Sequence, residues 1–277
     1  MPNIFLTGGS GFVGSHFVNH AHQVGYNLHC LRRPGSKTRV ELYKEPCWYD
    51  GYLEENWSNV LKSCEYFVHI AAAGVDPLKS NYEDLIKANI TDSTKLILSA
   101  VKSGIQKFLI LGTYWEYGST AESFEFIPVD AYLQPINRYA ATKAASCMLA
   151  CQIAQEHNIK LQYLRIGQVY GEGEPGNRLW PSLRKAALNG EDYHLTLGEQ
   201  IRNFTPVESI ASEVVDALNF RCINRGKPKI ANIGSGRPQS LRQFAEYWWS
   251  RWHAKGKLHF GSMPYRKDEI MRFVPEV

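Results

Sequence analysis

The stretch TGGSGFVG (residues 7–14) decides the fold of this chain of 277 residues. It follows an apolar run that begins at Ile4, and the residues after it, 13–24, have helical periodicity. Glycines at a strand-to-helix turn allow a tight bend and a close backbone approach to a pyrophosphate, whose charge the helix N-terminus favours. Because a predicted strand and a predicted helix flank it, the motif predicts a dinucleotide site. The expected contacts here are Gly8, Gly11, Phe12, Val13 and Gly14.

Further apolar runs and helical segments alternate along the chain. The runs are 28–31, 67–71, 108–111 and 161–166, and the helical segments include 82–101 and 139–157. Such alternation predicts an α/β fold, a Rossmann-type doubly wound parallel sheet with right-handed crossovers. Residues 1–166 plus about 205–235 are expected to form this dinucleotide-binding domain. A smaller, discontinuous lobe is expected from about 167–204 plus 236–277, with Ser240 capping a helix there.

The overall composition is ordinary for a soluble globular protein, with 44% hydrophobic residues, 21% charged residues and a net charge of +4. No block of five like charges occurs, which argues against nucleic acid as a partner. No apolar stretch reaches the roughly 18 residues of a spanning helix, and MPNIFLTGG has no signal-peptide pattern, so we expect a cytoplasmic protein. The six cysteines form no C-x-x-C pair, which favours reduced thiols and no metal site.

Three residues form a candidate catalytic group. Tyr139 and Lys143 are one helical turn apart, so they share a helix face. A free phenol has a pKa of about 10. A neighbouring ammonium and the positive charge of a nicotinamide lower that pKa, which lets a tyrosine transfer a proton at neutral pH. Thr113 follows the predicted strand 108–111 and is expected to act beside Tyr139 in carbonyl or alcohol chemistry.

The end of the second predicted strand bears on cofactor choice. An acidic residue there would select NAD. This chain has Arg32 and Arg33 instead, and guanidinium groups suit the 2′-phosphate of NADP(H). The alternative is a basic loop that only faces solvent. The sequence therefore favours NADP(H), with NAD(H) as the second possibility.

Taken together, these motifs resemble the extended short-chain dehydrogenase/reductase family, in its nucleotide-sugar epimerase/dehydratase branch. The resemblance covers essentially the whole chain and includes HIAAAG (69–74), RIGQVYG (165–171), GEQIRNF (198–204) and NIGSG (232–236). It implies that Thr113 hydrogen-bonds the reacting oxygen, that Tyr139 is the acid/base, and that Lys143 holds the nicotinamide ribose. The further cofactor contacts that it implies are Leu53, Ala71, Ala72, Ala73 and Asn89.

The resemblance also implies a nucleotide-diphosphate sugar as substrate. Arg202 and Arg266 match positions that contact the diphosphate, and Glu269 matches one that contacts the nucleoside ribose. Two guanidinium groups on a diphosphate make physical sense, since they bind its oxygens bidentately. Further substrate contacts are expected from Tyr114, Gln168, which replaces the usual Asn, and Arg178.

A departure from the family separates the possible reactions. The dehydratases carry an Asp-Glu pair directly after the threonine, whereas this chain has Tyr114 and Trp115. Glu116 comes one position later and, on a continued strand, would point the other way. Dehydration is therefore not expected.

Three functions remain open. The two arginines favour NADPH-dependent reduction of a 4-keto nucleotide-diphosphate sugar, with Tyr139 as proton donor, and GEQIRNF and FGSMPYRKDEIM resemble the reductases that make CDP-abequose and CDP-paratose. An epimerase would use the same Thr113, Tyr139 and Lys143. A non-catalytic NADP-binding module would typically have lost the tyrosine or the lysine. The family also implies a homodimer, formed through the helical segments 82–101 and 139–157.

Overall fold

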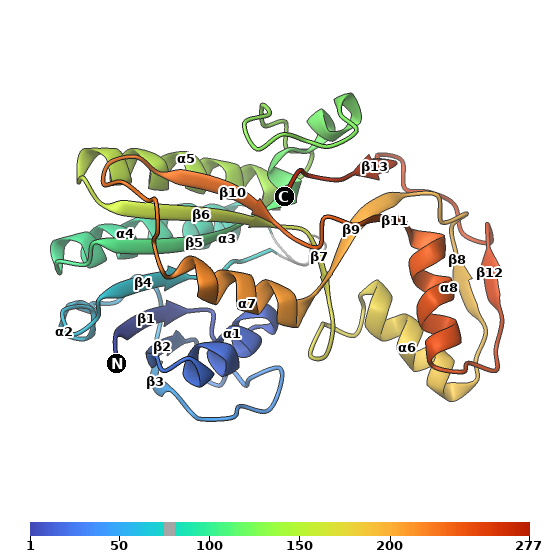
Figure 1. Ribbon diagram of the computed structural model, residues 1–277, viewed down its shortest axis with the longest axis horizontal. Helices are drawn as coiled ribbons and strands as arrows, with labels where there is room; N and C mark the ends of the chain where they lie inside the picture. Colours follow the sequence, from blue (N-terminus) through green and yellow to red (C-terminus); the bar gives the residue numbers. More distant parts are fainter. Residues whose placement is uncertain (75–80) are drawn as a thin grey trace.

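A central parallel sheet organises the computed structural model, which describes residues 1–74 and 81–277. In spatial order its strands run β10-β6-β5-β4-β1-β2-β3, and every neighbouring pair is parallel (Figure 1). The doubly wound α/β fold is therefore confirmed. The strands are β1 (Asn3–Thr7), β2 (Asn27–Arg32), β3 (Cys47–Asp50), β4 (Tyr66–His69), β5 (Lys107–Thr113), β6 (Lys160–Ile166) and β10 (Lys229–Ile233).

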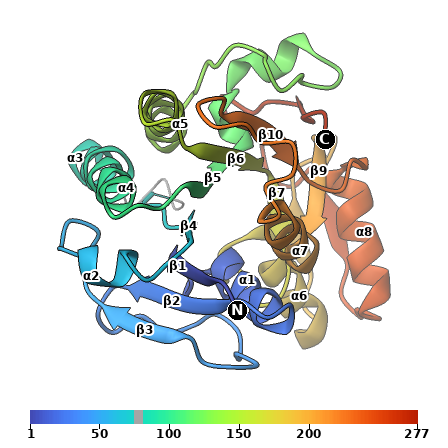
Figure 2. The ribbon, with the colours of Figure 1, turned by 60° about the vertical axis from the view of Figure 1, so that its left-hand side comes forward.

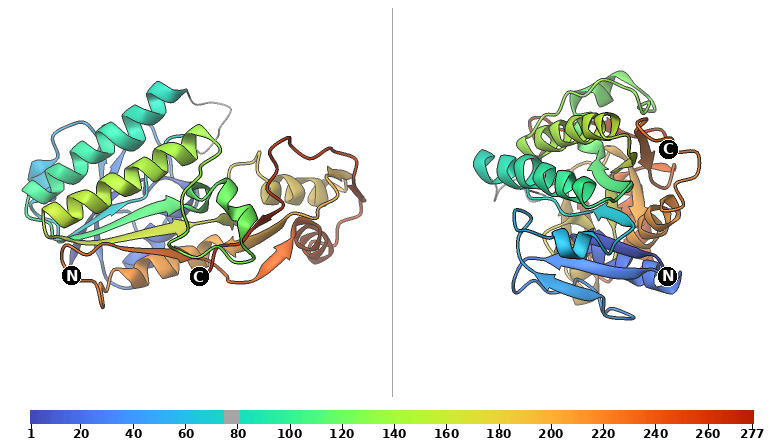
Figure 3. Two further views of the ribbon diagram at one scale, coloured as in Figure 1. Left: turned by 90° about the horizontal axis from the view of Figure 1, so that it is seen from above. Right: turned by 90° about the vertical axis from the view of Figure 1, so that its left-hand side faces the viewer.

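Helices cover both faces of this sheet (Figures 2 and 3). One face carries α1 (Phe12–Gln23) and α7 (Val207–Ala217), which contact each other. The opposite face carries a longer set of helices, in which a π-helical segment connects α3 to α4. This set is α3 (Tyr82–Leu85), η1 (Ile86–Asp92), α4 (Ser93–Lys102) and α5 (Arg138–Glu156), with the short α2 (Ser58–Leu61) near the strand edge.

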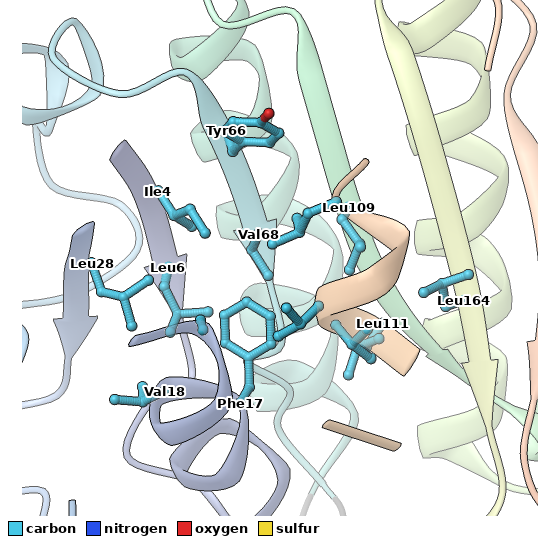
Figure 4. Close-up of a cluster of buried hydrophobic side chains, with 14 of the residues drawn as sticks. Ile4, Leu6, Phe17, Val18, Leu28, Tyr66, Val68, Leu109, Leu111 and Leu164 are labelled. Carbon is cyan, nitrogen blue, oxygen red and sulfur yellow. The ribbon is translucent and has the colours of Figure 1, made fainter. Parts of the chain in front are cut away.

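The core between the sheet and α1 follows from the apolar periodicity of that helix (Figure 4). Phe17 and Val18 project from α1 onto the sheet and are fully buried. They meet Leu6 of β1 and Val68 of β4, whose strands are apolar on both faces because helices cover both. Burying one such side chain contributes about 1.5–3 kcal/mol. This packing fixes the start of α1 against the end of β1.

A second body of structure lies beyond the carboxyl ends of the sheet strands, at the right of Figure 1. Its strand β9 pairs with β7 and β13 in parallel and with β11 in antiparallel, while β8 pairs with β12. Aromatic side chains fill its interior, and Phe204 stacks on Phe244 with ring centroids 4.1 Å apart. The elements are β7 (Gln168–Tyr170), α6 (Leu179–Asn189), β8 (Tyr193–Leu195), β9 (Ile201–Pro206), β11 (Pro238–Ser240), α8 (Leu241–Arg251), β12 (Leu258–Phe260) and β13 (Arg272–Phe273).

The predicted cap of α8 is confirmed. The Ser240 hydroxyl accepts a hydrogen bond from the Gln243 backbone N–H at 3.0 Å, and the Gln243 side chain accepts one from the Ser240 N–H at 2.8 Å. The division of the chain into two domains at the boundaries given above stays a prediction.

Two further observations concern the chain as a whole. All six cysteines are free thiols. Across residues 1–74 and 81–277, no helix has both the length and the apolar character needed to cross a membrane.

Candidate functional site

The glycine-rich loop lies where the strand order reverses, between β1 and β4. Gly8 adopts φ +80°, and a Cβ there would lie 2.5 Å from the Ala71 backbone nitrogen, so only glycine permits this approach of the two loops. A Cβ on Gly14 would collide with the Gly8 carbonyl, to which the Gly11 N–H donates at 3.0 Å. Phe12 and Val13 begin α1. The loop thus leaves the N-terminus of α1 free to receive a pyrophosphate.

The loop after β4 is held in place by Asn89, which lies in the π-helical segment η1. Its Oδ1 accepts from the Ala73 N–H at 2.8 Å, and its Nδ2 donates to the Ala73 carbonyl and to Thr142 Oγ1, both at 3.0 Å. Short π-helical turns occur frequently at functional sites. Asn89 therefore fixes the loop after β4 beside the glycine-rich loop and connects that loop to α5.

Thr113, Tyr139 and Lys143 come together at the carboxyl end of β5. Thr113 ends β5, and Tyr139 lies in the first turn of α5, where Asn137 caps the helix by accepting from the Ala140 N–H at 2.9 Å. The Thr113 side chain lies close enough to Tyr139 for hydrogen bonding between them to lower the Tyr139 pKa. Lys143 is buried, and its Nζ donates to the Leu111 carbonyl at 2.7 Å.

The charge environment of Tyr139 differs from the one that the sequence suggests. Burial raises the pKa of the phenol and the charge of Glu116 raises it further, while the hydrogen bond with Thr113 and the charge of Arg178 oppose the rise. Burial also lowers the pKa of Lys143. The expectation that the Lys143 ammonium lowers the Tyr139 pKa is therefore wrong for this structure, in which Nζ binds the β5 backbone. The phenol is held in its protonated form, the form that can give up a proton.

The predicted direction of Glu116 is also wrong. β5 ends at Thr113, and Tyr114–Glu116 form the 3₁₀ turn η2, so the strand alternation no longer applies. Glu116 folds back, and its Oε1 accepts from the Thr113 N–H at 2.8 Å. The two positions that are acidic in dehydratases are instead apolar packing positions, with the Trp115 ring 5.1 Å from that of Phe273.

At the ends of β2 and β3 the structure adds a residue that the sequence reading missed. Arg32 Nε donates to Asp50 Oδ1 at 2.8 Å, and its guanidinium lies 4.6 Å from the centroid of the Trp48 ring. Arg33 is exposed. Asp50 ends β3 and lies opposite Arg32 in the strand register, and the short segment CWYD had given no clear strand signal. Leu53 follows β3 and packs partly buried against the core.

The two predicted diphosphate ligands differ in exposure, and their contact with a diphosphate stays a prediction. Arg202 on β9 is buried; its Nη2 donates to Glu269 Oε1 at 2.7 Å and its Nη1 to the Ile201 carbonyl at 2.9 Å. Arg266 is exposed in the loop before β13. Arg178 is the N-cap residue of α6 and is close enough to influence the Tyr139 pKa.

Two further predicted substrate residues have structural partners. Tyr114 is buried, and its hydroxyl donates to the Ile233 carbonyl at 2.6 Å. Gly167 and Gly234 make room for it, since a Cβ on either would contact the Tyr114 side chain. Gln168 begins β7 and pairs with Phe204. Their contact with a substrate stays a prediction.

A groove of about 460 Å³ opens beside Tyr139. Tyr139 is among the residues that line it. Its lining consists of Tyr82, Leu85, residues 135–139 and Ala141.

Comparison with known proteins agrees with this arrangement. The model of the NAD-dependent epimerase/dehydratase family matches residues 4–234, which span the glycine-rich loop, Thr113, Tyr139 and Lys143. The chain belongs to this family. Membership confirms the resemblance described above and the expectation of an NAD(P)-dependent oxidoreductase of the epimerase/dehydratase type.

Individual members of the family show the range of the similarity. CDP-abequose synthase of Salmonella muenchen is 26% identical, with 97% of this chain and 87% of that protein covered. dTDP-6-deoxy-L-talose 4-dehydrogenase (NAD(+)) of Aggregatibacter actinomycetemcomitans is 23% identical, with 97% of each covered. The structure of UDP-glucose 4-epimerase with UDP-glucose from Thermotoga maritima matches with a TM-score of 0.86 at 24% identity, covering 99% of this chain and 89% of that one, and shares the fold.

Proposed function

We propose that this protein reduces the 4-keto group of a nucleotide-diphosphate sugar, taking hydride from NADPH and a proton from Tyr139. The observation that carries the proposal is the pairing of Thr113 and Tyr139 at the carboxyl end of β5, beside an open groove. Reduction of a ketone consumes a hydride and a proton. A phenol whose pKa is raised by burial and by Glu116 stays protonated at neutral pH and can supply that proton.

The residues divide this reaction among them. The loop Gly8–Gly14 would hold the pyrophosphate of the nicotinamide cofactor, which supplies the hydride, and Ala71–Ala73 would lie along it. Thr113 and Tyr139 would both hydrogen-bond the ketone oxygen, so that negative charge developing there is stabilised as the proton moves. Lys143, held by the Leu111 carbonyl, is the residue proposed to bind the nicotinamide ribose.

The ends of β2 and β3 bear on the choice between NADPH and NADH. Arg33 is exposed and follows β2, and Arg32 stacks on Trp48, an arrangement suited to a planar base or a phosphate. Asp50 opposes a preference for NADPH, because its carboxylate pairs with Arg32 and would repel a phosphate. We infer that NADPH is preferred and that NADH is also accepted, since the Arg32 guanidinium that would bind a 2′-phosphate is already paired with Asp50.

The proposed substrate class rests on the second lobe and on the relatives. Arg202 and Arg266 would bind the diphosphate and Glu269 the nucleoside ribose, and the Arg202–Glu269 ion pair places two of these groups side by side. CDP-abequose synthase and dTDP-6-deoxy-L-talose 4-dehydrogenase are named for products or substrates that are nucleotide sugars. This chain matches almost their full length.

Epimerisation is the second candidate function. It is supported by the UDP-glucose 4-epimerase match and by Asp50, a carboxylate near the position that selects NAD, because an epimerase returns its hydride and needs no NADPH. A non-catalytic NADP-binding module is a minor third candidate, which the intact Thr113, Tyr139 and Lys143 disfavour. A homodimer through α3–α4 and α5 and a cytoplasmic location stay predictions.

A substrate screen tests the proposal. The protein is incubated with NADPH or NADH and with CDP-, dTDP-, UDP- and GDP-linked 4-keto sugars, and cofactor oxidation is followed by absorbance. A reductase oxidises one cofactor per sugar reduced. Inversion at C4 of the corresponding 4-hydroxy sugars, supplied with NAD⁺ and without net change of the cofactor, would indicate the epimerase. Cofactor binding without any turnover would indicate the binding module. A thermal-shift series on the same ligands reports binding separately from turnover.

A further inference from the structure

A buried ion pair lies directly beneath the catalytic threonine. Glu116 is fully buried and Arg165, on β6, is only 3% exposed. Arg165 Nε donates to Glu116 Oε2 at 2.9 Å, and Arg165 Nη1 donates to the Tyr117 hydroxyl at 2.9 Å and to the Val129 carbonyl at 3.1 Å. Desolvating a carboxylate and a guanidinium is costly, and such a pair is often no more stable than an apolar replacement. Stability alone therefore gives a weak reason for placing these charges here.

The second carboxylate oxygen of Glu116 faces the catalytic group. Oε1 accepts from the Thr113 N–H at 2.8 Å and from the Tyr163 hydroxyl at 2.8 Å. The Tyr163 hydroxyl also reaches the Lys143 carbonyl at 3.2 Å, so the same network touches the backbone of α5. Gly112 leaves the space in which these groups meet, since a Cβ there would lie 2.2 Å from the Tyr163 ring and 2.6 Å from Glu116 Oε1.

The bond to the Thr113 N–H sets the backbone direction at the end of β5. Thr113 is extended, with φ −142° and ψ 146°, and the chain turns into η2 immediately after it. Glu116 closes that turn as a capping box with Thr113. The direction of the Thr113 hydroxyl toward Tyr139 follows from this turn, because χ1 of a threonine has few choices once its backbone is fixed.

We propose that Glu116, held by Arg165, is a positioning residue that aims Thr113 at the reacting oxygen and sets the electrostatic field at Tyr139. This inference rests on the proposed carbonyl chemistry at Tyr139 and adds a residue to it. Glu116 touches neither the reacting oxygen nor the cofactor, and it acts through Thr113 and through its charge.

Several charged or polar groups face Tyr139. Thr113 comes from β5, Glu116 from η2, Lys143 from one turn further along α5, and Arg178 from the start of α6. Burial raises the Tyr139 pKa most, and the charge of Glu116 raises it next. Thr113 and Arg178 lower it. Removing the charge of Glu116 should therefore lower the Tyr139 pKa. If Glu116 had only a structural role, the same change would leave the Tyr139 pKa where it is.

The experiment measures Tyr139 itself. Phenolate absorbance is titrated with pH in the full chain saturated with oxidised NADP, and each protein is compared with the same protein carrying Tyr139→Phe. We expect the Tyr139 titration to move to lower pH in Glu116→Gln and in Glu116→Gln/Arg165→Met. The double variant removes both charges, so it avoids the unpaired buried guanidinium that could unfold the single variant. Glu116→Asp keeps the charge and should titrate near wild type.

Turnover gives the second measurement. With the substrate found in the screen, kcat should fall by about 10- to 100-fold in the Gln and Asp variants. Asp is one methylene shorter and loses the reach to the Thr113 N–H, whereas Gln keeps the reach but replaces the charged acceptor that Arg165 holds by a neutral amide. KM for the sugar and for the cofactor should stay near wild type. Glu246→Gln, which removes the carboxylate of an exposed pair with Arg242, is the matched control and should change neither kcat nor the titration.

The outcomes separate this inference from the proposed function. An unchanged Tyr139 titration in the folded double variant, or an Asp variant that titrates like the Gln variant, would overturn it. Wild-type kcat in both single variants would overturn it as well. If no sugar is turned over by the wild type, the proposed function fails, and the phenolate titration still decides the inference.

Discussion

In the proposed reduction Tyr139 supplies the proton, and its surroundings define the pH range in which it can do so. Burial and Glu116 raise the pKa of this phenol, so it is protonated at neutral pH and loses its proton only when the pH rises through its raised pKa. Reduction should therefore be retained at neutral pH and lost on the alkaline side, whereas the reverse oxidation should increase there. Measuring kcat against pH in both directions checks the sign, and an acid-side loss of reduction would contradict it.

Removing the phenol hydroxyl separates chemistry from binding. Tyr139→Phe should lower turnover by about 100-fold or more, as loss of a general acid usually does, while the cofactor affinity stays close to wild type. Tyr132→Phe, at an exposed tyrosine, is the matched control. Turnover is measured by steady-state assays and cofactor affinity by calorimetry, on both variants. Unchanged turnover in Tyr139→Phe would show that another group supplies the proton.

Three residues at the ends of β2 and β3 are proposed to decide between NADPH and NADH. Replacing Arg32 and Arg33 by Ser should raise KM for NADPH much more than KM for NADH, because only NADPH carries the 2′-phosphate. Asp50→Asn should have the opposite sign: it removes a negative charge and frees Arg32 Nε, so KM for NADPH should fall relative to that for NADH. Equal effects on the two cofactors in both variants would mean that these groups do not contact the adenosine ribose.

Helix α5 is the element that brings Tyr139 and Lys143 to the end of β5, and its first turn depends on Asn137. Asn137→Ala removes the bond to the Ala140 N–H and should cost about 1 kcal/mol of unfolding free energy. It should also lower kcat, since Tyr139 lies in that first turn. Ser240→Ala removes the equivalent bond from α8 and should cost similar stability without changing kcat. Urea denaturation and steady-state kinetics on both variants distinguish a cap that positions the site from one that only stabilises a helix.

Substitutions in the two bodies of the molecule should affect substrate binding and turnover separately. If Arg266 binds the diphosphate, Arg266→Lys keeps the charge but loses the planar fork, and sugar-nucleotide binding should weaken by about 1–3 kcal/mol with kcat preserved. Thr113→Val should do the reverse and lower kcat with little change in affinity. Calorimetry and turnover on the pair make the comparison. Wild-type binding by Arg266→Lys would show that the diphosphate lies elsewhere.

How far the sequence predicts this molecule depends on how local each signal is. TGGSGFVG, the five apolar runs and the Ser240 cap are local patterns, and β1, β2, β4, β5, β6 and α8 form where they were expected. Strand β3 was missed because CWYD is short and exposed at both ends. Asp50 was missed with it, because its importance comes from the register that places it opposite Arg32.

Glu116 shows the same limit within the site. The alternation of the strand was assumed to continue beyond Thr113, where β5 ends. No local pattern reveals that Arg165, 49 residues later, forms an ion pair with Glu116. Its signal was a carboxylate among aromatic residues in a segment expected to be buried, which requires a partner somewhere in the fold. Local patterns predict elements, whereas the pairing of buried charges needs the tertiary structure.

The fate of the hydride tests the central claim most directly. NADPH carrying deuterium at the transferred position is supplied with the 4-keto nucleotide sugar that the screen identifies, and the product is analysed by mass spectrometry. We expect one deuterium in each product molecule and one NADPH oxidised for each, with both lost in Tyr139→Phe. Failure to form a deuterated product, together with inversion at C4 of the matching 4-hydroxy sugar without net change of the cofactor, would contradict the reductase and favour the epimerase.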